Sequence, residues 1–155
     1  GIRMEPIHRL LFNIEVRESL SFLLGFYREK GMNAQLLKPG ETVTGGHVLE
    51  YSSESGLGLL HIERPATDIV ADTLQSGLDA LLDAFPQACI DYIHGWDALQ
   101  TLSKAPGCLG FLLPQIRKET LFTTVMNGGV LPRKAFSIGE ADEKRYYMEG
   151  KRIRP

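Results

Sequence analysis

The residues best suited to chemistry gather in the last quarter of the chain, where two glycines and two tyrosines stand among basic side chains. Arginine presents a planar fork of donors to a phosphate or carboxylate, lysine presents a point charge, and serine adds a hydroxyl. A helix beginning near Gly139 would add free N–H groups to such an anion site. Residues 129–147 therefore predict an anion-binding surface. Its polar members are Arg133, Lys134, Ser137, Lys144 and Arg145.

The same charges also suit a solvated tail in which acidic neighbours pair with the basic ones. Glu140, Asp142 and Glu143 stand close enough in sequence to pair with Lys144 and Arg145. The chain holds no glycine pattern of the Walker type, so no motif supports a nucleotide. Both interpretations of the segment stay open on the sequence alone.

Histidines supply the second group of candidates. His94 follows an apolar run and precedes Gly95, where it would transfer a proton or donate to a phosphate, although a capping or core role suits it equally. Asp91 and Asp97 flank it and could orient its ring. His8 is the other catalytic candidate, and Arg9 beside it is a phosphate-binding candidate, although neighbours on a strand point to opposite faces.

A metal site is not expected. His47 and His61 would face each other across a hairpin if Ser52 pairs with Gly56, but a third ligand at fixed spacing is missing. The two cysteines each stand in an apolar, strand-like run. We expect Cys89 and Cys108 to be buried, reduced thiols.

Hydrophobic periodicity indicates alternating strands and helices, with a loop over 38–45. Thr67 or Asp68 is the expected cap of the second helix. The predicted class is α/β (or α+β), a single layered domain with a mixed sheet of about five strands flanked by about five helices. Strands are expected over 7–13, 46–52, 57–63, 88–94 and 108–113, and helices over 16–30, 69–84, 96–104, 116–127 and 140–150.

The strand–helix–strand unit over 88–113 has the length of a parallel, right-handed crossover, and its apolar strands suggest a sheet covered on both faces. If its strands are parallel, His94 and Pro114-Gln115 share one edge of the sheet. Ligands of open α/β sheets bind beyond the carboxyl ends of strands. This edge is therefore the expected place for a ligand.

Composition narrows the classes of partner. The chain has 155 residues, 43% hydrophobic and 23% charged, and no apolar run long enough for a membrane helix. Its net charge is −2, but residues 129–155 hold seven basic against four acidic side chains, and the rest holds ten against fifteen. A positive patch on an acidic body favours a small anionic metabolite or nucleotide over nucleic acid, in a cytoplasmic protein.

Several stretches resemble the bacterial domain-of-unknown-function family 1015, in order and across almost the whole chain. The motif over Leu131–Gly139 is the most specific of them. The others are Pro6–Arg9, Tyr92–Gly95, Gly110–Pro114 and Glu143–Tyr147. Members of that family are longer, so the resemblance implies that this chain is a C-terminal part whose partner is its own missing N-terminal domain.

The resemblance also implies a function, because members of the family are labelled ParB-like and that fold includes kinases of free serine. The expectation is a phosphoryl-transfer enzyme acting on a small metabolite, with ATP or ADP and Mg bound in the full-length protein and no activity in this part alone. No catalytic residue is carried over from the family. The alternatives are a ParB-like, nucleic-acid-associated regulator and a non-catalytic interaction or dimerisation domain that forms a homodimer.

Overall fold

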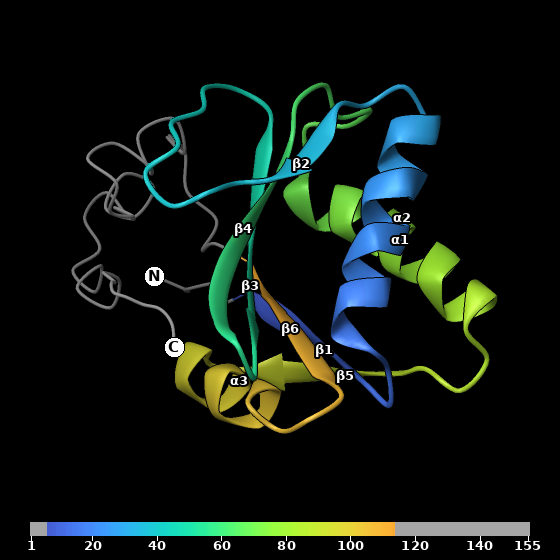
Figure 1. The fold of residues 1–155 in the computed structure, drawn as a ribbon, viewed down its shortest axis with the longest axis vertical. Coiled ribbons are helices and arrows are strands. Elements are labelled where there is room, and N and C mark those ends of the chain that lie inside the picture. Colours follow the sequence, from blue (N-terminus) through green and yellow to red (C-terminus); the bar gives the residue numbers. More distant parts are fainter. Residues whose placement is uncertain (1–5, 114–155) are drawn as a thin grey trace, which may run out of the picture.

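The computed structural model describes residues 6–113, which fold into three helices and one six-stranded sheet (Figure 1). This confirms the predicted α/β or α+β class. Two of the expected helices, 116–127 and 140–150, lie outside the described residues. The elements are β1 (Ile7–Phe12), α1 (Val16–Glu29), β2 (Ala34–Leu36), β3 (His47–Ser53), β4 (Gly56–Ile62), α2 (Val70–Ala84), β5 (Cys89–His94), α3 (Trp96–Ser103) and β6 (Cys108–Leu112).

The strands lie in the order β2-β4-β3-β6-β1-β5, and every neighbouring pair is antiparallel. The strand pairing thus differs from the mixed sheet that we expected. β5 and β6 do run in the same direction, as predicted, but β1 lies between them and is antiparallel to both. The crossover through α3 therefore spans β1, a long-range pairing that local periodicity does not reveal.

This topology brings all four histidines of the chain to one end of the sheet. β1 and β3 begin at this end, whereas β4 and β5 finish there. The four rings belong to His8, His47, His61 and His94, each within two residues of a strand terminus. We call this the histidine end. We call the other end, where β1 passes into α1 and β3 turns into β4, the turn end.

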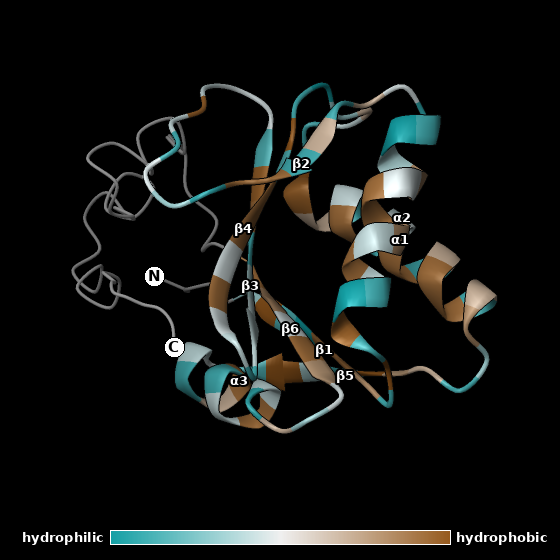
Figure 2. Cartoon of the chain, in the orientation of Figure 1, coloured by the Kyte–Doolittle hydropathy of each residue, from teal (hydrophilic) through white to brown (hydrophobic). Residues whose placement is uncertain are grey.

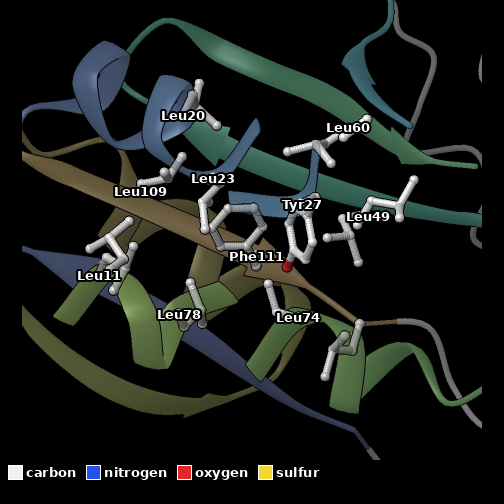
Figure 3. Close-up of a cluster of buried hydrophobic side chains, with 14 residues drawn as sticks. Leu11, Leu20, Leu23, Tyr27, Leu49, Leu60, Leu74, Leu78, Leu109 and Phe111 are labelled. Atoms are coloured by element: carbon white, nitrogen blue, oxygen red, sulfur yellow. The ribbon is translucent and has the colours of Figure 1, made fainter. Parts of the chain in front are cut away.

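Helices cover the two faces of the sheet unequally. α1 and α2 lie side by side on one face, which we call the helix-pair face, and α3 lies on the other, the α3 face (Figure 1). Apolar residues run along the strands and along α2 (Figure 2). The helix-pair core includes Leu11, Leu23, Tyr27, Leu60, Leu74, Leu78, Leu109 and Phe111 (Figure 3). The smaller α3 core consists of Leu10, Leu99, Cys108 and Leu112.

A tyrosine locks the two helices of the larger core together. The hydroxyl of Tyr27 in α1 donates to the Thr73 carbonyl in α2 at 2.8 Å, and burial raises its pKa. Gly77 makes the close approach possible, since a Cβ there would lie 2.4 Å from the Tyr27 hydroxyl oxygen. The aromatic ring thus fills the space that a larger residue in α2 would occupy.

Three local predictions were wrong. The N-cap of α2 is Ile69, which makes no side-chain capping bond, and the Thr67 hydroxyl only accepts from the Ile69 N–H at 3.1 Å. β2 was not predicted, because three residues are too short for a periodic pattern. β5 is an edge strand with mostly exposed residues rather than a covered one, so Cys89 is exposed while Cys108 is buried as expected.

Within residues 6–113, no helix has the length and apolar character needed to cross a membrane.

Candidate functional site

His8 is buried at the histidine end, and its ring forms a hydrogen bond with the backbone. Its side chain is 4% exposed and lies on the α3 face, and its Nδ1 accepts the N–H of Leu113 at 3.0 Å. An accepting Nδ1 carries no proton, so the proton of the neutral ring is on Nε2. The expected catalytic role of His8 is not supported by this position, because Arg9 and His94 lie on the opposite face.

His47 joins the start of β3 to the start of α2. Its Nε2 lies 3.3 Å from the Asp68 carbonyl and its Nδ1 lies 3.0 Å from the Thr73 hydroxyl. Because a carbonyl only accepts, Nε2 carries the proton and Nδ1 accepts from Thr73. Desolvation lowers the pKa of His47, and the Asp68 carbonyl and charge oppose this only partly.

His61 is also buried, and it holds the loop before β3. Its Nε2 donates to the Gly45 carbonyl at 2.9 Å. The hairpin pairs Ser53 with Gly56, one residue away from the expected register, so His61 lies opposite Val48. A shift of one residue moves a side chain to the other face, and His47 and His61 therefore do not face each other. No group of three metal-binding side chains occurs in the part of the chain that the structure describes.

His94 differs from the other three histidines because it is exposed. It is the last residue of β5, on the helix-pair face, opposite Ile7 of β1. Its ring makes no hydrogen bond within residues 6–113. Asp91 does not orient it as expected, since that carboxylate points along the free edge of β5 and accepts the Tyr92 N–H at 2.9 Å.

Arg9 shares the helix-pair face with His94 and is held in place by α2. Its Nε donates to Gln75 Oε1 at 3.0 Å, and Gln75 Nε2 donates to Asp79 Oδ1 at 2.9 Å. An Nη1 donor bonds the Ile7 carbonyl, and the guanidinium carbon lies 5.2 Å from the centroid of the Tyr92 ring. These hydrogen bonds use two of the five guanidinium donors, so three remain for a ligand.

Four side chains on paired strands thus form one patch at the histidine end. Ile7 lies opposite His94, and Arg9 lies opposite Tyr92, all on the helix-pair face of β1 and β5. We call these four residues the edge quartet. Neither Tyr92 nor Gln75 was singled out from the sequence, because only the pairing of β1 with β5 brings them to Arg9.

A helix begins immediately beside this patch. Gly95 is the N-cap of α3 and adopts a φ of 94°, a conformation that favours glycine, and its carbonyl accepts the Leu99 N–H. The first N–H groups of a helix have no partner inside that helix. The helix terminus carries partial positive charge one residue after His94, while α3 itself packs on the α3 face of the sheet.

The turn end holds a different feature, a cavity of about 530 Å³ that the sequence did not predict. Two carboxylates line it, and that of Glu15 accepts the Glu18 N–H at 2.8 Å as the N-cap of α1. Asn13 beside them has a φ of 66° and donates to the Gln87 carbonyl at 3.1 Å. Negative charge here opposes the binding of an anion, so the cavity is not a second phosphate site.

The remaining predicted phosphate ligands, Arg133, Lys134, Ser137, Lys144 and Arg145, lie outside the described residues. Leu113, the last described residue, lies at the histidine end beside His8. Comparison of the chain with models of protein families, with curated proteins and with solved structures gave no match.

Proposed function

We propose that this domain binds the phosphate of a small ligand at the edge quartet, as part of a phosphoryl-transfer enzyme acting on a small metabolite. The observation that carries the proposal is the pairing of β1 with β5. It sets an exposed histidine and an anchored arginine on one face, next to the start of α3. Within residues 6–113 no other histidine is exposed.

Each side chain has a role that its chemistry suits. Arg9 neutralises phosphate charge, and its bond to Gln75 fixes the guanidinium before the ligand arrives. His94 donates to a phosphate oxygen or exchanges a proton with the acceptor group.

The enzymatic part of the proposal rests only on the resemblance to family 1015 noted in the sequence, since no family model matches the chain. That resemblance implies that ATP or ADP with Mg is bound in a longer cytoplasmic protein, together with an N-terminal domain. The basic residues of 129–147 stay in the proposal on the sequence alone, because they lie outside the described residues.

Calorimetry with pyrophosphate tests the proposal on this chain and on the longer protein. Arg9→Gln and His94→Gln should each weaken binding, because a charge-assisted hydrogen bond is worth roughly 1.5–3 kcal/mol. Arg17→Gln is the matched control, since Arg17 is exposed on α1 at the turn end and should have no effect. The proposal fails if neither protein binds pyrophosphate, or if the two variants bind as tightly as the control.

A further inference from the structure

Tyr92 gives the edge quartet an aromatic surface that a phosphate site does not need. Its side chain is 50% exposed, and Ile7, diagonal to it in the quartet, is 37% exposed. β5 is the outermost strand of the sheet, so no further strand of the described chain lies beside the ring. An amphipathic ring at the margin of a sheet is a surface on which a planar ligand can stack.

The Tyr92 ring is held on one side by Arg9. The Arg9 guanidinium lies over it at 5.2 Å, and Arg9 is itself anchored by Gln75 and through it by Asp79. The backbone N–H of Tyr92 donates to the Asp91 carboxylate at 2.9 Å, a bond that fixes the main chain of β5 next to the ring. A ring whose orientation is fixed before binding loses less conformational entropy when a ligand stacks on it.

The spacing within the quartet fits one class of ligand. Tyr92 and His94 are two residues apart on one face of β5, which separates them by about 7 Å along the strand. A base on Tyr92 and a phosphate near His94 and Arg9 would be joined by a ribose, whose length is of that order. A phosphorylated metabolite without a ring would leave Tyr92 unused.

We propose that the ligand of the edge quartet is a nucleoside phosphate whose base stacks on Tyr92 while its phosphate binds Arg9 and His94. This inference rests on the proposed function and names its ligand class. Stacking does not depend on the identity of the base, because every base presents a π face. Discrimination among bases therefore comes from other groups.

Calorimetry with ADP and pyrophosphate, run in parallel on the full chain, separates the base from the phosphate. Wild-type protein should bind ADP more tightly than pyrophosphate. Tyr92→Leu keeps an apolar side chain but removes the ring, and should weaken ADP binding about 5- to 150-fold while leaving pyrophosphate unchanged. Tyr92→Phe should retain most of the ADP affinity.

Phe12→Leu is the matched control, because Phe12 is an aromatic residue of β1 that is 37% exposed at the turn end. It should change neither affinity, and thermal melting should show that all three variants fold. If pyrophosphate binds but ADP binds no more tightly, or if Tyr92→Leu leaves ADP affinity intact, the base-stacking inference is overturned and the anion site stands. If neither ligand binds to this chain or to the longer protein, both proposals are overturned.

Discussion

The two ends of the sheet are held together by different kinds of bond. At the histidine end, three buried rings each bond the backbone of a neighbouring segment: His8 at Leu113, His47 at Asp68 and His61 at Gly45. At the turn end, the Ile14 N–H donates to the Gly107 carbonyl, the Asn13 side chain donates to the Gln87 carbonyl, and the Ser103 hydroxyl donates to the buried Ser52 hydroxyl at 2.7 Å. The first end thus depends on buried imidazole rings, and the second on backbone, amide and hydroxyl groups.

This difference determines what each end tolerates. A buried imidazole that both donates and accepts can do so only in one tautomer and only while it is neutral. The free energy of unfolding should therefore be sensitive to acid and to substitution at the histidine end. The turn end instead encloses a cavity lined by carboxylates and should tolerate side-chain changes better. His94, exposed among three buried rings, is then the histidine that stability does not require.

The largest expected effect is the loss of stability on alanine substitution at two adjacent glycines of the histidine end, where the two losses should differ. Gly45 and Gly46 have φ values of 73° and 72°, but a Cβ on Gly46 would lie 2.2 Å from the Ile62 carbonyl oxygen, whereas one on Gly45 would contact nothing. Alanine should cost about 1–2 kcal/mol at either position for the backbone conformation. At Gly46 the overlap should add about 1–3 kcal/mol.

Urea unfolding of Gly45→Ala and Gly46→Ala measures the two costs directly. Gly107→Ala serves as the turn-end counterpart, with a φ of 79° and only a 3.4 Å approach to the Ile14 carbonyl oxygen. It should resemble Gly45→Ala. Equal free energies of unfolding for Gly45→Ala and Gly46→Ala would show that the loop before β3 moves freely away from β4. That result would contradict the view that the histidine end is firmly held.

The next largest effect is a difference in stability between alanine variants of two histidines at the histidine end. His8→Ala removes the acceptor of the buried Leu113 N–H, which should cost about 1–3 kcal/mol, and the lost ring adds a cavity. His94→Ala removes an exposed ring and should change the free energy of unfolding by less than about 0.5 kcal/mol. Chemical unfolding of the two variants gives both values. A destabilisation by His94→Ala as large as that by His8→Ala would remove the case for a binding role of His94.

Apart from the three-residue strand β2, the elements within residues 6–113 were predictable from the sequence, whereas their pairing was not. A hydrophobic repeat of 3.6 residues predicted the bounds of α1 and α2 to within one residue at either end, because one face of each helix is apolar. Pairing across the sheet depends on contacts between distant segments, such as Arg9 with Phe111 and with Tyr92. Periodicity reports which face is buried but not which strand lies alongside.

The β3–β4 hairpin shows how a small error of register changes a candidate site. Its loop has two residues, Glu54 and Ser55, between the paired Ser53 and Gly56, whereas His47 would face His61 only if Ser52 paired with Gly56 across a three-residue loop. Both lengths are common in hairpins, so sequence does not decide between them. The difference of one residue moved His47 and His61 to opposite faces. His94 was predictable because a strand end followed by glycine is a local feature.

The pH dependence of stability provides a smaller test of the histidine end. Since the folded-state pKa of His47 lies below the unfolded value of 6.5, the unfolded chain binds more protons once the pH falls below about 6.5. The contribution of neutral His47 is thus present above that pH and declines as acid is added, by at most about 1.4 kcal/mol per pH unit. His47→Gln should flatten the stability profile between pH 7 and pH 5. An unchanged slope in His47→Gln would contradict the assignment of His47 as the group whose folded-state pKa is lowered.

The smallest expected effect is a difference in the reactivity of two thiols at the turn end, with no change in stability. Cys89 is an exposed free thiol at the start of β5, while Cys108 is 9% exposed, lines the cavity and has its pKa raised by burial. A thiol reagent should modify one thiol per native chain quickly and the second only as the chain unfolds, since the thiolate is the reacting form. Cys89→Ser should abolish the fast phase. Because Cys108 belongs to both the cavity wall and the α3 core, fast modification of two thiols would mean that the turn end opens without unfolding. The hydrogen bonds at the turn end would then resist opening less than those of the buried rings at the histidine end.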